Sequence, residues 1–146
     1  MLLDDIRNNS VWNQRFFVIT QTSGWTGEVV SREVDYAWQK ILSVKRNESA
    51  WNYLRGVLDH SEGQTLKDDV RVRCEELLQS GCDSPYLLGF LVELYKQQLE
   101  DDSNADKAEL VTKVKSLCEQ LAQEHDTVRC KYWNFISDSI VKKHSL

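Results

Sequence analysis

The stretch Asn8-Asn9-Ser10-Val11-Trp12-Asn13 returns later in the chain as Asn47-Glu48-Ser49-Ala50-Trp51-Asn52. The two copies agree at four of six positions, and the offset from Asn8 to Asn47 is 39 residues. A shorter third copy, Ser84-Pro85-Tyr86, begins 35 residues after Ser49. A repeat of about this length that contains two helices is typical of an α-solenoid, in which neighbouring helical hairpins bury their apolar faces against one another.

The apolar residues of the rest of the chain support a helical repeat, because they return at intervals of three and four. This period predicts long helices over 30–44, 66–77 and 110–121, and shorter aromatic helices near 11–21, 50–60, 85–100 and 128–141. The chain has only one proline and six glycines, which is little material for the turns of an all-β fold. We therefore expect an all-α protein: one α-α superhelix (solenoid) domain over 1–146, with three to four helical hairpins and repeats starting near 8, 47, 82 and 126.

The serine of each copy suggests where the first helix of a hairpin begins. If Ser10 and Ser49 are N-caps, Val11 and Ala50 occupy the first helical position. The third copy agrees, because Pro85 follows its serine and proline is well tolerated at that position. A weaker fourth copy, Asp126-Thr127-Val128, precedes the last helix, and its aromatic residues come later than the register demands.

Large aromatic residues just inside these helices are expected to fill the joints between adjacent hairpins. The residues predicted to do so are Trp12, Trp51, Tyr86 and Trp133. Their polar neighbours are harder to explain by packing. Asn13 and Asn52 could reach back to a cap amide, whereas Arg15 has no such local use. We therefore place a protein–protein contact at Arg15 together with Asn8 and Asn13, and add Asn52 as the equivalent of Asn13.

Several classes of function are disfavoured by composition and motifs. A net charge of −5, with basic residues interleaved among acidic ones, argues against nucleic acid as a partner. No apolar run approaches the length of a membrane span, and no secretory signal is visible, so we expect a cytoplasmic protein. The four cysteines contain no C-x-x-C pair and the three histidines are scattered, which predicts no metal site and no bound cofactor in this chain. Because no catalytic constellation is found either, the chain alone is expected to be inactive.

The repeated phrases, taken together with Gln14-Arg15-Phe16-Phe17 and Lys131-Tyr132-Trp133-Asn134, closely resemble a known family. The chain resembles the C-terminal half of the α subunit shared by protein farnesyltransferase and type I protein geranylgeranyltransferase, whose repeat contains a W-N-x-R core. The second copy departs from this core, because Leu54 replaces the arginine and Arg55 follows one place later.

The resemblance implies a division of labour between two subunits. In that family, a β subunit holds the zinc and most of the isoprenoid pocket, and magnesium also belongs to the heterodimer. The α subunit wraps around the β subunit and brings a lysine towards the isoprenoid diphosphate. That lysine belongs to the repeat before Asn8, so upstream repeats and any catalytic residue are absent from this chain.

The resemblance thus implies part of a heterodimeric prenyltransferase that transfers farnesyl or geranylgeranyl to the cysteine thiol of a C-terminal CaaX sequence. Asn8, Asn13, Arg15 and Asn52 are its candidate contacts with the β subunit. Two alternatives stay open at this point: the α subunit of a Rab-type geranylgeranyltransferase, and a non-catalytic helical-repeat scaffold with another partner. The detailed match of the phrases argues against the Rab-type subunit.

Overall fold

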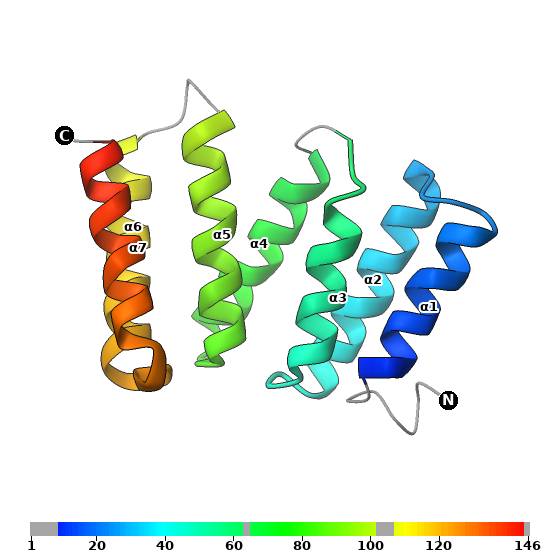
Figure 1. The fold of residues 1–146 in the computed structure, drawn as a ribbon, viewed down its shortest axis with the longest axis horizontal. Helices are drawn as coiled ribbons and strands as arrows, with labels where there is room; N and C mark the ends of the chain where they lie inside the picture. Colours follow the sequence, from blue (N-terminus) through cyan, green and yellow to red (C-terminus); the bar gives the residue numbers. More distant parts are fainter. Residues whose placement is uncertain (1–8, 63–64, 102–106, 145–146) are drawn as a thin grey trace. The chain divides into compact units, whose positions relative to one another are not determined.

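The structure, a computed structural model, describes residues 9–62, 65–101 and 107–144, and within these ranges it consists of helices joined by short connections (Figure 1). In chain order, the helices are α1 (Asn9–Gln21), α2 (Gly27–Ser43), α3 (Glu48–Leu58), α4 (Thr65–Gln79), α5 (Pro85–Asp101), α6 (Lys107–Gln120) and α7 (Cys130–Lys143). A π-helical turn, Leu121–His125, and a 3-10 turn, Thr127–Arg129, separate α6 from α7. The all-α prediction and the positions of all the predicted helices are confirmed.

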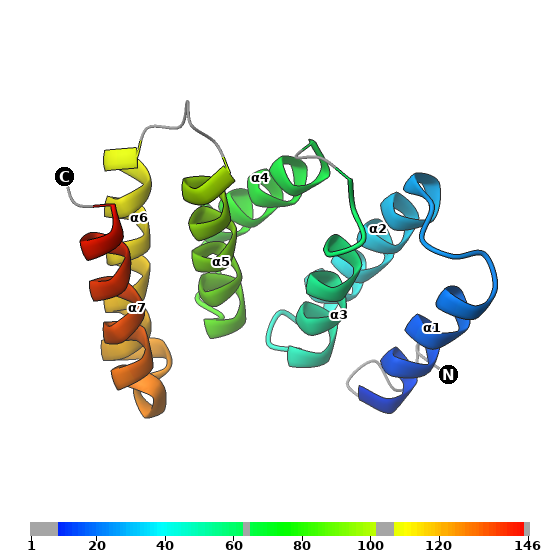
Figure 2. The same ribbon diagram turned by 45° about the horizontal axis from the view of Figure 1, so that its top comes forward.

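The chain divides into two compact units, Met1–Val72 and Arg73–Leu146, and the boundary falls within α4. In the first unit, α2 and α3 form an antiparallel hairpin, and α1 packs against α3 (Figures 1 and 2). Fully buried aliphatic residues at helical spacing join α2 and α3, namely Val34, Ala37, Ile41, Leu54 and Val57. This is the apolar face that the sequence period predicted.

In the second unit, α6 packs against both α5 and α7, again with aliphatic residues at the contacts. Leu87, Leu91, Val114, Cys118 and Leu121 are completely or almost completely buried. Trp133 of α7 lies close to α5, since a Cβ atom added to Gly89 would be 3.3 Å from the indole ring. The absence of a side chain at Gly89 therefore lets these two helices approach closely.

Local signals explain several of the helix boundaries. Thr26 caps α2, because its side-chain oxygen accepts a hydrogen bond from the backbone N–H of Val29 at 3.2 Å. Gly24 and Gly81 follow α1 and α4 in the left-handed backbone region, with φ of 72° and 103°. That conformation strongly favours glycine at the end of a helix.

The predicted serine cap of the second copy is wrong. Helix α3 begins at Glu48, so Asn47 takes the N-cap position and Ser49 lies inside the first turn. Likewise, Ser10 lies within α1, which begins at Asn9. In the third copy, Pro85 is the first residue of α5, as expected.

The helix starts also change the register of the repeat. Trp12, Trp51 and Trp133 are each the fourth residue of their helix, and all three are buried. Leu88 holds this position in α5 and is buried, whereas Tyr86 lies two residues earlier and is only partly buried. The fourth copy, which looked out of register in the sequence, is therefore in register when counted from the start of its helix.

Candidate partner interface

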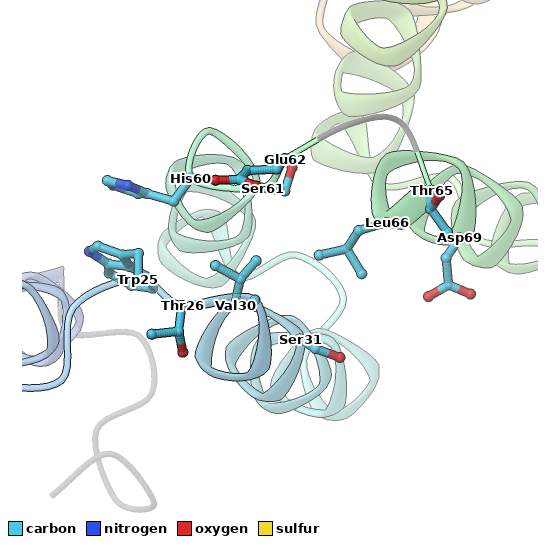
Figure 3. Close-up of a pocket in the computed structure, with 11 residues that line it drawn as sticks. Trp25, Thr26, Val30, Ser31, His60, Ser61, Glu62, Thr65, Leu66 and Asp69 are labelled. Atoms are coloured by element: carbon cyan, nitrogen blue, oxygen red, sulfur yellow. The ribbon is translucent and has the colours of Figure 1, made fainter.

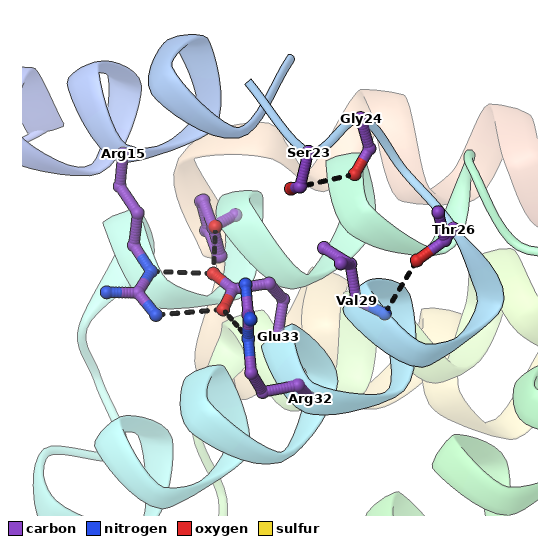
Figure 4. Close-up of polar contacts among 8 residues, drawn as sticks. Arg15, Ser23, Gly24, Thr26, Val29, Arg32 and Glu33 are labelled. Atoms are coloured by element: carbon purple, nitrogen blue, oxygen red, sulfur yellow. Dashed lines mark hydrogen bonds and ion pairs between the residues drawn. The ribbon is translucent and has the colours of Figure 1, made fainter. Parts of the chain in front are cut away.

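Glu33 of α2 is the centre of a polar cluster that ties three helices together (Figure 4). Its carboxylate is completely buried and accepts two hydrogen bonds from Arg15 of α1, from Nε at 2.6 Å and from Nη2 at 2.8 Å. The hydroxyl of Tyr53 in α3 donates a further bond at 2.6 Å. Arg32 Nε also lies 3.2 Å from the carboxylate. This two-pronged arginine–carboxylate geometry is among the stronger polar interactions in proteins.

The guanidinium of Arg15 lies over an aromatic ring of α2. Its central carbon lies 3.8 Å from the centroid of the Tyr36 ring, within the range of a cation–π contact. Trp12 packs against both tyrosines of the cluster, with ring centroids 6.0 Å from Tyr36 and 4.8 Å from Tyr53. Arg15 is thus part of the packing of the first unit, through contacts with α2 and not within its own helix.

The cluster keeps opposite charges on Arg15 and Glu33. Burial alone would raise the pKa of Glu33, but the hydrogen bonds from Arg15 and Tyr53 outweigh it and lower this pKa. The hydrogen bond to Glu33 raises the pKa of Arg15. Burial and the same carboxylate raise the pKa of Tyr53, so its hydroxyl stays protonated and continues to donate. At neutral pH, the cluster is therefore an ion pair with a neutral donor beside it.

Arg15 keeps some capacity for a further contact. Its side chain is 30% exposed, whereas that of Glu33 is fully buried. The hydrogen bonds to Glu33 use Nε and Nη2, and in the described part of the chain Nη1 makes none. In Figure 4 this nitrogen points away from the carboxylate. A guanidinium held in this way is oriented before any partner arrives, which lowers the entropic cost of binding.

Asn13 and Asn52 line one groove between α1 and α3, with a volume of about 230 Å³. Both side chains are exposed. The groove is completed by Trp12, Phe16, Ser49, Tyr53 and Gly56. The structure thus brings together two of the residues that the sequence predicted, from corresponding positions of two repeats. Asn8 lies outside the described residues.

A larger cavity of about 520 Å³ lies at the other end of these helices, where α1 leads into α2 and α3 leads towards α4 (Figure 3). Val30 and Leu66 point into it, and Trp25 stacks on His60 with ring centroids 4.8 Å apart. Its remaining lining residues are Thr26, Gly27, Ser31, Ser61, Glu62, Thr65 and Asp69. Asn13, Arg15 and Asn52 do not line this cavity.

The aromatic residues predicted to pack the repeats lie in different surroundings. Trp12 and Trp51 are each 1% exposed, and the indole N–H of Trp51 donates to the carbonyl of Lys45 at 3.0 Å. Trp133 donates in the same way to the carboxylate of Asp126 at 2.9 Å. Both tryptophans therefore hold the segment that precedes their own helix.

Sequence reasoning missed Glu33 and Tyr53, although the sequence contains a signal for the first. Glu33 lies on the predicted apolar face of α2, between Val30 and Val34. A carboxylate in such a row must be paired once the face is buried. Arg15, the cation without an explanation in its own helix, was the natural partner. Only the fold brings Tyr53 to the same place.

The described residues include no group of three His, Cys, Asp or Glu side chains that could hold a metal ion. Within the same ranges, no helix combines the length and the apolar character needed to cross a bilayer.

Residues 30–61 match the model of one protein family, the protein prenyltransferase alpha subunit repeat. The match covers most of α2 and all of α3, and so includes Glu33, Asn52 and Tyr53.

Curated relatives extend the likeness over most of the chain. The "Protein farnesyltransferase/geranylgeranyltransferase type-1 subunit alpha" of Solanum lycopersicum is 38% identical over 135 residues, which cover 84% of this chain and 39% of the relative. The protein of the same name from Dictyostelium discoideum is 29% identical over 143 residues, or 93% of this chain and 41% of the relative. The Arabidopsis thaliana counterpart is 30% identical, over 91% of this chain and 44% of the relative. The chain thus spans about two fifths of the length of these relatives.

One solved structure shares the fold. A chain of "Candida albicans protein geranylgeranyltransferase-I complexed with GGPP" superposes with a TM-score of 0.73 at 23% identity, covering 95% of this chain and 43% of that one. The helical arrangement of this chain is therefore shared with that chain.

Proposed function

We propose that the chain acts as part of the α subunit of a heterodimeric protein prenyltransferase, because residues 30–61 match the prenyltransferase α-subunit repeat and most of the chain aligns with proteins named as α subunits. Its role there is to support and wrap a β subunit. The heterodimer transfers farnesyl or geranylgeranyl from the diphosphate to the cysteine thiol of a C-terminal CaaX sequence. We also propose that it does so in the cytoplasm.

The observation that carries this proposal is the extent of the likeness to the relatives. Between 84% and 93% of the chain aligns with proteins named as farnesyltransferase/geranylgeranyltransferase type-1 α subunits. A scaffold that merely shared a helical repeat would not be expected to align with one named enzyme subunit over so much of its own length. The names of the relatives also favour this subunit over the Rab-type one.

The interface with β is proposed at Asn8, Asn13, Arg15 and Asn52. Asn13 and Asn52 are exposed and line one groove, and Arg15 is held by Glu33 with Nη1 left for another acceptor. Arginine is enriched at the energetically important positions of protein interfaces because its planar group can satisfy several acceptors. A preorganised arginine and two exposed amides, on separate faces of the same helical unit, are suited to that role.

The chemistry of the transfer belongs, in this proposal, to the β subunit. Zinc held by the β subunit would supply an activated acceptor thiol, since a thiol coordinated to zinc is deprotonated. Magnesium is likewise a component of the heterodimer and not of this chain. The part played by the present residues is to build the surface on which β assembles, so the chain alone is expected to be inactive.

The test is coexpression of the chain with a tagged farnesyltransferase β subunit and, separately, with a type I geranylgeranyltransferase β subunit. Copurification on the tag measures assembly. Transfer from the matching isoprenoid diphosphate to a CaaX peptide is then assayed, with a full-length α subunit as the positive control. We expect the chain to copurify with β and to have no activity without it.

Two results bear on the alternatives. A chain that never copurifies with either β subunit, while the full-length α subunit does, would contradict the proposal and favour a scaffold with another partner. Transfer by the chain in the absence of β would contradict the proposed division of labour.

A further inference from the structure

The groove between α1 and α3 has the composition of a site for a polypeptide backbone. Its floor is aromatic, formed by Trp12, Phe16 and Tyr53, and its exposed rim carries the amides of Asn13 and Asn52. None of the residues that line it has a charged side chain. The groove therefore offers hydrogen bonds and apolar contact, but no charge with which to select a charged ligand.

The two amides have hydrogen-bonding capacity to spare. In the described part of the chain, Asn13 makes no hydrogen bond through its side chain, and Asn52 accepts one from Arg55 at 3.0 Å. A primary amide has one acceptor oxygen and two N–H donors, so it can pair with both the C=O and the N–H of one residue in an extended chain. A helical segment could not use this pairing, because its own backbone groups are already hydrogen-bonded.

The size of the groove also fits a short extended stretch of polypeptide. Its volume of about 230 Å³ lies below the usual range for cofactor and drug-sized pockets, which begins near 300 Å³. It suits a single bulky side chain with its adjoining peptide unit. Gly56 leaves space along one wall of the groove, since a Cβ atom there would already be 3.4 Å from the ring of Phe16.

We propose that this groove binds an extended segment of the prenyltransferase β subunit. Asn13 and Asn52 pair with its backbone, and one uncharged side chain lies on the floor formed by Trp12, Phe16 and Tyr53. The inference rests on the proposed function for the identity of the partner, and adds to it the mode of binding. Because the contact is made mainly to the backbone, it does not require a particular charged residue in β.

The first test measures affinity for a purified β subunit with three variants of the chain. Asn13→Ala and Asn52→Ala each remove the amide at the rim, and Gln14→Ala is the matched control, because Gln14 is the exposed neighbour of Asn13 and does not line the groove. We expect each asparagine variant to raise the Kd for β about tenfold, the effect of losing one or two interface hydrogen bonds. Gln14→Ala should bind like the parent chain.

The second test identifies what occupies the groove. A photo-crosslinking phenylalanine analogue at Ser49, inside the groove, should label one contiguous stretch of β, and the same analogue at Gln14 should not. Hydrogen exchange then reports the backbone of that stretch: its amides should exchange freely in isolated β and become protected in the complex. Asn13→Ala should reduce this gain in protection.

The outcomes separate this inference from the proposed function. If the parent chain binds β but both asparagine variants bind as tightly as Gln14→Ala, the proposed function stands and the groove inference is wrong. The inference is also wrong if the labelled stretch is already protected in free β, as a helix would be. Failure of the parent chain to bind β would overturn both.

Discussion

Arg15 joins α1 to α2 through two hydrogen bonds to a carboxylate that is closed off from solvent. Burying a charge is costly unless it is paired, so each member of this pair needs the other. The exposed edge of Arg15 is then free for a second role. We therefore expect substitutions at this pair to affect both the stability of the first unit and the affinity for a partner.

Replacing Glu33 by Gln tests the stabilising role. The variant leaves a buried amide beside the cation of Arg15, and we expect the free energy of unfolding to fall by about 2 to 4 kcal/mol at pH 7. Urea denaturation followed by tryptophan fluorescence measures the change. Glu28→Gln in the first turn of the same helix is the control, because Glu28 is exposed. Equal stability of the two variants would contradict a structural role for the pair.

The same pair predicts how stability depends on pH. The pKa of Glu33 is lower in the folded protein than in the unfolded chain, where it is near 4.3. The carboxylate therefore contributes stability above about pH 4.3, and this contribution is lost as the pH falls through the folded pKa. The difference in unfolding free energy between the parent and Glu33→Gln should accordingly shrink on acidification. A difference that is constant from pH 7 to about pH 3 would argue against the ion pair.

At the scale of the element, the sequence predicts where helices lie better than where they begin. The three- and four-residue spacing of apolar residues located α2, α4 and α6, because that spacing is a consequence of burying one face. Breakers and aromatic residues located the shorter predicted helices between and around them. The start of α3 was predicted at Ala50 and lies at Glu48. Asparagine and serine are almost equally good N-cap residues, so Asn47 and Ser49 could not be told apart locally. Contacts between helices, such as that of Glu33 with Tyr53, could likewise not be predicted from the spacing of residues within one helix.

Trp51 offers a test at this scale, because it both fills the core and holds the end of the preceding loop. Trp51→Ala should lower the free energy of unfolding by about 3 to 5 kcal/mol, since a large buried ring is lost. Trp51→Phe keeps an aromatic ring but removes the hydrogen bond to the carbonyl of Lys45.

We expect the phenylalanine variant to lose less, about 1 to 2 kcal/mol, in thermal or urea unfolding. If Trp51→Ala unfolded like the parent chain and lost only binding to β, the ring would be an interface anchor and its assignment to the core would be wrong.

At the scale of the whole molecule, α1 and α3 are corresponding helices of two successive repeats, so their residues can be compared position by position. Gly56 of α3 lies against Phe16 of α1, the corresponding helix of the preceding repeat. The position that corresponds to Gly56 in α1 is Phe17, which is 61% exposed, and the next residue, Val18, is 46% exposed. In a helical-repeat protein, each hairpin buries its apolar face against a neighbour. The exposed face of α1 around Phe17 and Val18 is therefore expected to associate with other apolar surfaces.

The resulting prediction concerns self-association of the chain. Phe17→Gln should raise the dissociation constant of self-association at least about tenfold, because burial of one phenylalanine is worth about 1.5 to 3 kcal/mol. Val128→Gln is the control, since Val128 is 95% exposed and lies outside α1. Sedimentation equilibrium over a range of concentrations measures both. A chain that is monomeric throughout, or two variants that behave alike, would contradict this account of α1.

Sedimentation velocity is the direct test of the proposed assembly of the chain with a prenyltransferase β subunit. The purified chain and a purified β subunit are run separately and then as an equimolar mixture. We predict that the mixture forms one faster species with the mass of a 1:1 heterodimer. Two boundaries that keep the sedimentation coefficients of the separate proteins, under conditions where β binds a full-length α subunit, would contradict the proposed assembly.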